Sequence, residues 1–347
     1  MKLFKHPLFL VGFLYLLLLF VASYFVDSIY KPEIEPNVVY DGNGNVIGVT
    51  PLPPFGRHLL GTDEQGVDML YKLIDGAKYT IGLVILVSIL RLTFSLFFGG
   101  LLSTRFFKKT KGFLTNLSDS FHYAPAALIV YVIAAPVVIV FSWAFTPEMR
   151  LILTAGALTL VAVPSLSLVI ASEIGQINQR DFITNARLLG GSSFHIFRKH
   201  AAPYLMPRLL ILFTQQFIQV LLLFAHLALL GLFMGGTVLK VTPTGLRAAN
   251  STDPPPMELK QIPFSHEWGG LIAQAIDHIS FHRWLIYEPV IAMTITIFST
   301  ILIVEGMKSV FLNQRPFRRR RKNQKTNQGT DGPSFEFLKE KRRELPF

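Results

Sequence analysis

The stretch that decides the fold is DFITNARLLGGS, residues 181–192, which lies between two long apolar stretches. Basic residues outnumber acids around it, so the positive-inside bias predicts a cytoplasmic loop. Phe182, Ala186 and Leu189 fall on one face at three- and four-residue spacing, which predicts a helix over the first half. The glycine pair can end that helix in a left-handed conformation, and the serine after it can cap a second helix. The sequence therefore predicts a helix–glycine–helix hairpin, a shape able to dock into a groove on a cytoplasmic partner.

The composition is that of a membrane protein. Of 347 residues, 51% are hydrophobic and 12% aromatic, and the mean hydropathy is +0.44. A net charge of +11 could indicate a nucleic-acid partner. The basic residues instead gather in short segments beside apolar stretches, so no nucleic acid is expected. The chain has no cysteine, which excludes disulfides, thiolate catalysis and cysteine-ligated zinc.

Six apolar stretches are long enough to cross a bilayer, and both ends of the chain are expected in the cytoplasm. Lys2 and Lys5 precede the first stretch and no small-residue cleavage site follows it, so a retained helix is expected rather than a signal peptide. The sequence predicts an all-α polytopic membrane protein with six transmembrane helices. Their expected ranges are about 7–26, 79–103, 117–145, 150–171, 209–233 and 289–311.

Two segments between the apolar stretches are expected outside the cell, because one is net acidic with turn-like Asp-Gly and Asn-Gly pairs and the other is rich in proline. A basic tail follows the last stretch, and its charge is suited to anionic membrane lipids. The expected division is an N-terminal transmembrane helix (1–26), an external segment (27–78), a five-helix core (79–312) containing the loop 175–208 and an external segment (236–288), and a basic cytoplasmic tail (313–347).

Arg91 is the most informative polar residue within an apolar stretch. An arginine in mid-membrane costs several kcal/mol unless it faces a polar cavity or an acid. Asp119 and Glu173 are available as acidic partners, whereas snorkelling or a shifted span border is the alternative. Pro125 and Pro136 lie in the third stretch, where the backbone carbonyls they leave unpaired are tolerated beside a cavity or a neighbouring helix.

Two patterns could bind metal ions. His278 and His282 have the four-residue spacing of a helical metal clamp, but no third ligand is evident, so an interfacial helix is expected. The GTDEQG segment at 61–66 offers oxygen ligands and glycines, yet its spacing is not that of an EF-hand. A capped turn leading to a short interfacial helix is therefore expected there, and no metal site is predicted.

The 181–203 segment resembles the cytoplasmic coupling loop of ATP-binding-cassette (ABC) importer permeases of the oligopeptide, dipeptide and nickel type. Thr184 stands where the family has the glutamate of its Glu-Ala-Ala signature, so any ion pair made by that glutamate is missing here. The residues that the resemblance assigns to coupling with an ATPase are Asp181, Phe182, Thr184, Asn185, Ala186, Arg187, Gly190, Ser192, Arg198, His200 and Pro203.

Further motifs follow in the order of the same family. Residues 58–68 are similar to its His-Pro-Leu-Gly-Thr-Asp stretch, with departures at Leu59 and Val67, and residues 266–272 are similar to its Trp-Gly motif. Arg91, Asp119, Pro125 and Glu173 are the candidates for the translocation pathway or for buried polar contacts. The external motif residues are Gly61, Thr62, Asp63, Gly66, Asp68, Trp268 and Gly269.

The resemblance implies a type I ABC importer permease in a bacterial-type plasma membrane. It implies a second permease subunit, two ATPase subunits, an external substrate-binding lipoprotein and a peptide substrate, with nickel or another small solute as the other option. No Gly-x-x-x-x-Gly-Lys-[Ser/Thr] motif is present, so ATP and Mg²⁺ are expected on the partner ATPases and this chain is expected to be non-catalytic, with no cofactor of its own.

Two other function classes compete with an importer permease. A membrane-embedded enzyme needs a convergent set of catalytic side chains at one depth, whereas the polar residues here are scattered. A degenerate permease that acts as a sensor or interaction protein remains open, because Thr184-Asn185 and Val67 are departures that such a protein would show.

Overall fold

The computed structural model of the protein describes residues 3–32, 34–36, 38–40, 44–104, 107–234, 237–243, 257–263 and 265–311. By its internal contacts the chain divides into residues 1–313 and residues 314–347. The prediction of a basic cytoplasmic tail at 313–347 therefore falls outside the described residues.

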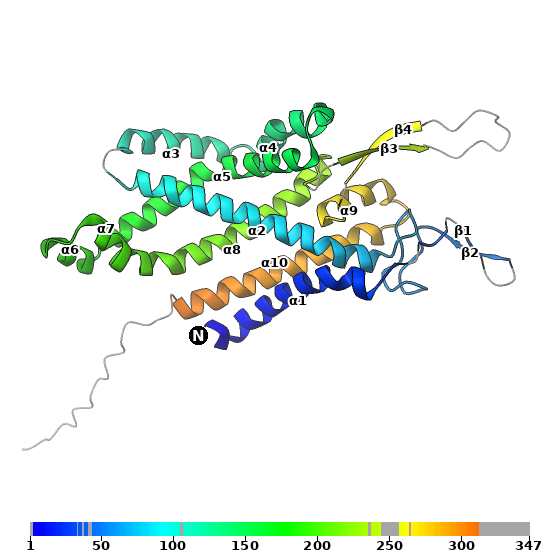
Figure 1. The fold of residues 1–347 in the computed structure, drawn as a ribbon, viewed down its shortest axis with the longest axis horizontal. Coiled ribbons are helices and arrows are strands. Elements are labelled where there is room, and N and C mark those ends of the chain that lie inside the picture. Colours follow the sequence, from blue (N-terminus) through cyan, green and yellow to red (C-terminus); the bar gives the residue numbers. More distant parts are fainter. Residues whose placement is uncertain are drawn as a thin grey trace, which may run out of the picture. The chain divides into compact units, whose positions relative to one another are not determined.

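The fold is predominantly helical, as predicted, and within the described ranges five helices are long and apolar enough to cross a membrane (Figure 1). Hydrocarbon offers no partner for backbone N–H and C=O groups, so a helix is the conformation in which an apolar stretch satisfies them internally. The five are α1 (Pro7–Ile29), α2 (Met69–Leu102), α5 (Pro147–Asn178), α8 (Ala202–Leu229) with the π-helical turn η5 (Phe197–Ala201) before it, and α10 (Trp284–Phe311).

Two of the long helices, α2 and α5, begin before their predicted borders, where a polar residue caps each of them. Asp68 accepts a hydrogen bond from the backbone N–H of Leu70 at 2.7 Å, so α2 begins ten residues before the expected 79, inside the segment 27–78. Thr146 accepts from the N–H of Met149 at 3.4 Å and starts α5.

The third apolar stretch is interrupted, and the prediction of one continuous span over 117–145 was wrong. It consists of α3 (Lys108–His122), α4 (Ala126–Ala135), the π-helical η3 (Pro136–Val140) and the 3-10 turn η4 (Ser142–Ala144). Pro125 separates α3 from α4 because proline has no N–H and disfavours a helical conformation in the residue before it. The apolar part, Ala126–Val140, is shorter than the other spans, and five long helices plus this one are consistent with six crossings.

Close packing of the long helices relies on small residues. α2 lies along α5, and α1 lies along α10 (Figure 1). A β-carbon added at Gly306 of α10 would lie 2.7 Å from the Cβ of Phe9, and one at Gly12 of α1 would collide with the carbonyl oxygen of Ser299. Glycine at both positions lets the two backbones approach, as small residues do in membrane helix pairs.

Shorter elements gather at the two ends of the bundle (Figure 1). Two antiparallel hairpins, which the sequence analysis did not predict, form within the predicted external segments. The helices α6 and α7 lie at the opposite end of the bundle from the hairpins and α9. These elements are β1 (Val38–Tyr40), β2 (Val46–Val49), β3 (Thr237–Pro243), β4 (Met257–Pro263), α6 (Asp181–Leu188), α7 (Ser193–Ile196), α9 (Trp268–Ala275), and the 3-10 turns η1 (Leu3–Lys5) and η6 (Ile276–His278).

We predict that the end carrying α6 and α7 faces the cytoplasm and that the end carrying α9 faces outward. The chain lacks cysteine, so single cysteines report their own position. The substitutions Phe55→Cys and Leu189→Cys replace side chains that are 84% and 88% exposed. In spheroplasts, a membrane-impermeant maleimide should label Phe55→Cys directly and Leu189→Cys only after permeabilisation. Labelling of Leu189→Cys in intact spheroplasts would invert the predicted topology.

Candidate functional site: a cavity and a helical hairpin

The hairpin, residues 181–196, has the turn chemistry that the sequence predicted. Gly190 adopts a left-handed conformation with φ of +80°, and the N–H of Gly191 donates to the carbonyl of Ala186 at 3.1 Å, which closes the end of α6. The hydroxyl of Ser192 accepts from the N–H of His195 at 3.3 Å at the start of α7. The predicted glycine stop and serine cap are therefore confirmed.

A buried apolar cluster holds the base of the hairpin on the long helices. Ile183 is fully buried and Ile196 is 4% exposed, and both pack with residues of α5 and α8. Phe182 stacks on Tyr204 with ring centroids 4.8 Å apart. The predicted apolar face was wrong at Leu189, which is 88% exposed, because α6 ends at Leu188 and Leu189 lies at its C-terminal cap.

The residues that the family resemblance assigned to coupling lie on the hairpin and on η5 and the start of α8, which follow it, and most of them are exposed. The two leucines at the tip of the hairpin, Leu188 and Leu189, are 81% and 88% exposed, and a β-carbon at Gly190 would meet nothing within 4 Å. Ala186 and His200 are partly buried. The exposed candidates are Asp181, Thr184, Asn185, Arg187, Gly190, Ser192, Arg198 and Pro203.

A cavity of about 860 Å³ lies within the bundle, and its walls come from α2, α3, α4, α5 and α8. Most of the lining is aliphatic. The polar side chains among the lining residues are Arg91, Ser118, Ser165, Gln215, Gln216, Gln219 and His226. Pro125, at the break between α3 and α4, also lines the cavity, which places the interrupted helix where irregular backbone is tolerated.

Arg91 lies in the cavity wall, but the acidic partners proposed from the sequence were wrong. The side chain is 2% exposed. Its Nε donates to the carbonyl of Leu158 at 3.0 Å and its Nη1 to Oε1 of Gln216 at 3.3 Å. Asp119 is exposed on α3, and Glu173 pairs with Arg208 at 3.5 Å. The rotation of α2 about its axis directs Arg91 to α5 and α8 instead.

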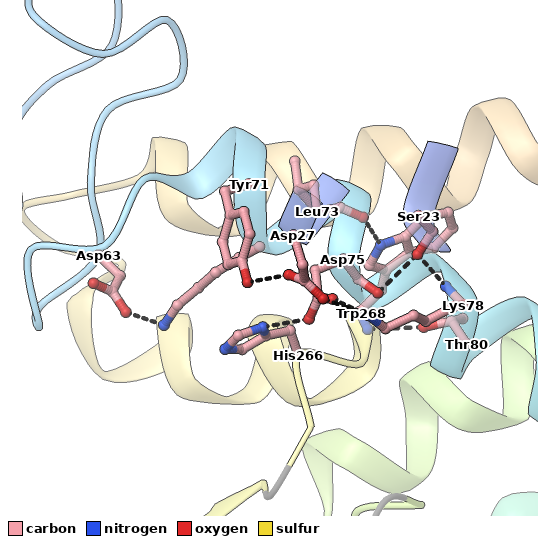
Figure 2. A network of polar contacts seen from close by, with 11 residues as sticks. Ser23, Asp27, Asp63, Tyr71, Leu73, Asp75, Lys78, Thr80, His266 and Trp268 are labelled. Carbon is pink, nitrogen blue, oxygen red and sulfur yellow. Dashed lines mark hydrogen bonds and ion pairs between the residues drawn. The ribbon is translucent and has the colours of Figure 1, made fainter. Parts of the chain in front are cut away.

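At the other end of the bundle, a polar network joins α1, α2 and the segment before α9 (Figure 2). Asp75 accepts from His266 Nδ1 at 2.7 Å and pairs with Lys78. Asp27, near the end of α1, accepts from the hydroxyl of Tyr71 at 2.7 Å and pairs with Lys78 at 3.3 Å. These contacts tie the N-terminal helix to the start of α2.

The Trp-Gly motif anchors α9 in the same region (Figure 2). Trp268 is 1% exposed, its indole N–H donates to the carbonyl of Leu73 at 2.8 Å, and its backbone N–H donates to the hydroxyl of Thr80 at 3.0 Å. A β-carbon at Gly269 would lie 3.1 Å from the Cβ of Ala228, so glycine permits close packing of α9 on α8.

The 61–68 motif forms the predicted capped turn. Oδ1 of Asp63 accepts from the N–H groups of Gln65 and Val67 at 2.9 and 2.8 Å, and Oδ2 pairs with Lys72. Gly61 and Gly66 have φ of +74° and +77°. The expectation of a short interfacial helix after the turn was wrong, because the turn leads directly into the long transmembrane helix α2. The oxygens of Asp63 are occupied by N–H and ammonium donors. Over the described ranges, no three His, Asp or Glu side chains are arranged to hold a metal ion.

Two further residues of the motif have structural contacts. The buried hydroxyl of Thr62 accepts from the N–H of Leu52 at 2.9 Å. Asp68 accepts from His58 Nδ1 at 3.0 Å and from the hydroxyl of Tyr30 at 2.9 Å, while it caps α2. The motif therefore organises the end of α1 and the start of α2.

Sequence reasoning missed the glutamines of the cavity and the residues of the polar network. Gln215, Gln216 and Gln219 stand out within the apolar stretch 209–233, and their spacing places them on neighbouring positions of one helix. Polar residues inside a membrane span are costly, so these three could have been identified beside Arg91. Asp75, Lys78 and His266 could not be identified in this way, because they lie outside the predicted membrane spans, where polar residues are common.

Residues 92–313 match the family described as the binding-protein-dependent transport system inner membrane component. The chain belongs to this family, and it is a multi-pass inner-membrane permease of the ABC importer class. The chain is 24% identical over 309 residues to a putative peptide transport system permease protein of Brucella abortus, covering 89% of this chain and 88% of the relative. It is 26% identical over 301 residues, 84% of each chain, to a di/tripeptide transport system permease protein of Pseudomonas aeruginosa.

The contact between Thr80 and Trp268 gives a stability prediction. Thr80→Val keeps the side-chain shape but leaves the buried N–H of Trp268 without its acceptor, which costs about 1–3 kcal/mol. The midpoint of thermal unfolding in detergent should fall. Thr294→Val is the matched control, since the Thr294 hydroxyl is exposed and bonds only the carbonyl of Val290 in its own helix. Equal midpoints for the two variants would contradict the anchoring role.

Proposed function

We propose that this chain is a permease subunit of an ATP-driven importer of short peptides, and that the hairpin docks on a partner ATPase. With a second permease subunit it forms the translocation pathway, of which the cavity is this chain's part. An external binding protein delivers the substrate, and the ATPases bind ATP and Mg²⁺. The names of the relatives support peptides as the substrate.

The observation that carries the proposal is the continuity between the hairpin and the cavity walls. The hairpin joins α5 to α8 through η5, and both helices line the cavity. Its base is fixed by the buried contacts of Ile183 and Ile196 with the long helices. A push on the hairpin therefore moves two cavity walls together, which is the lever that alternating access requires.

The tip of the hairpin supports a contact through shape and apolar surface. Leu188 and Leu189 project from the end of α6 with most of their surface exposed, as anchor residues do before a partner covers them. Thr184 is also exposed and cannot supply the charge of the family's glutamate. The leucines and the tight glycine turn are thus left to make most of the contact.

We predict that Leu189→Glu breaks this contact. A carboxylate placed in an apolar groove loses its hydration, which weakens binding of the ATPases. Co-purification of the ATPases should fall by about tenfold, which corresponds to a loss of about 1.4 kcal/mol of binding free energy. Abundance in the membrane should not change because the site is exposed. Leu59→Glu is the control, being the same substitution at an exposed leucine at the other end of the bundle. The docking assignment is wrong if both variants retain the ATPases equally.

We predict that Gly190→Val separates ATP hydrolysis from transport. Valine in the left-handed conformation is strained by about 1 kcal/mol or more, so the reversal between α6 and α7 should distort. Peptide uptake into proteoliposomes should fall while ATP hydrolysis continues. Gly231→Val is the control, because Gly231 also has a positive φ, +77°, and open space around it.

Normal peptide uptake by Gly190→Val with its ATPases bound would argue against the coupling role. The same assays distinguish the transporter from the sensor alternative. A sensor would bind the ATPases and give no ATP-dependent uptake with the unmodified chain.

A further inference from the structure

Arg91 presents an oriented guanidinium group at the cavity. The group has five N–H donors in a fixed plane, and the contacts to Leu158 and Gln216 use two of them. The bond to a backbone carbonyl holds the side chain against α5 without neutralising its charge. The remaining donors are on the guanidinium of a residue that lines the cavity.

The charge of Arg91 has no counter-ion within the described part of the chain. Its contacts are a backbone carbonyl and an amide oxygen, and none of the residues lining the cavity is an aspartate or a glutamate. A cation held in a low-dielectric wall without an anion is costly. The wall therefore favours an anionic group that enters the cavity.

Two glutamines extend the donor surface. Gln216 accepts from Arg91 and donates through Nε2 to Oε1 of Gln219 at 3.1 Å. Because Gln219 uses its Oε1 as the acceptor of this hydrogen bond, its amide nitrogen remains a donor. Gln219 lines the cavity and is exposed, so this donor is available on the cavity side. Arginine and amide N–H groups that converge on one space are suited to bind an oxyanion.

We propose that Arg91, Gln216 and Gln219 form a carboxylate-binding site in the cavity, used by a peptide during its passage. The proposal rests on the proposed function for the identity of the peptide. The carboxylate can come from the C-terminus of a peptide or from an acidic side chain. A volume of about 860 Å³ is within the range of ligand-binding pockets, so a short peptide fits. One cation and neutral amides give a site weak enough for release.

The test measures binding without relying on transport. The full chain, assembled with its partner subunits, carries Ser165→Cys as the only cysteine introduced into the permease, because Ser165 lines the cavity. A small neutral thiol reagent labels this cysteine in the absence of ATP. The probes are trialanine, its C-terminal amide, and alanyl-glutamyl-alanine amide, which carries a carboxylate only on its side chain.

Trialanine at millimolar concentration should slow labelling by about fivefold or more, whereas its amide should not. Protection by alanyl-glutamyl-alanine amide as well would show that the site accepts any carboxylate, and its failure would identify the C-terminus as the ligand. Arg91→Gln should abolish the difference between trialanine and its amide. Arg91→Lys keeps the positive charge and should retain part of this difference in labelling. Partial retention would indicate that the effect of Arg91→Gln comes from the lost charge and not from misfolding.

Equal labelling in trialanine and its amide, or a difference that survives Arg91→Gln, would overturn the carboxylate site. Uptake into proteoliposomes separates this result from the fate of the proposed function. Protection that depends on Arg91 without any ATP-dependent uptake would support the site and reject the transporter. Uptake with no Arg91-dependent protection would support the transporter and reject the site.

Discussion

The constraint on which the structure depends is that backbone polar groups within hydrocarbon must be paired. Long uninterrupted helices meet it for α1, α2, α5, α8 and α10. The exception is the stretch between α3 and α4, where Pro125 breaks the helix beside the cavity. This break lies at the cavity, where polar side chains such as Gln215 and Arg91 also gather. The break in the helix thus forms part of the cavity wall, because Pro125 lines the cavity.

The two ends of the bundle differ in how they are held. At the end that carries α9, ion pairs and hydrogen bonds around Asp75, Asp68 and Trp268 join α1, α2 and α9. At the other end, the hairpin rests on apolar contacts around Ile183 and exposes its tip. Directional polar contacts hold one geometry, whereas apolar contacts permit small sliding motions. The hairpin is therefore held by contacts that resist small shifts less than the polar contacts at the opposite end do.

Local chemistry was predictable from the sequence, and the pairing of distant side chains was not. Gly190 and Ser192 behave as expected because turn and cap geometry depends on neighbouring residues. The partners of Arg91 were assigned wrongly because they depend on the rotation of α2 and on which helices surround it. The break before Pro125 was missed because average hydropathy does not register a change of direction. The strand hairpins lie in segments where polarity indicated only an external position.

The packing of α1 on α10 has a consequence for biosynthesis. Gly12 and Gly306 fit the two helices together, and the hydroxyls of Tyr15 and Thr296 lie 3.4 Å apart across 281 residues of sequence. Because α1 is synthesised before α10, it must remain in the bilayer without this partner until α10 is inserted. Until then the side of α1 that carries Gly12 faces lipid or an insertion factor. A truncated chain that lacks α10 would leave this side of α1 without its partner helix.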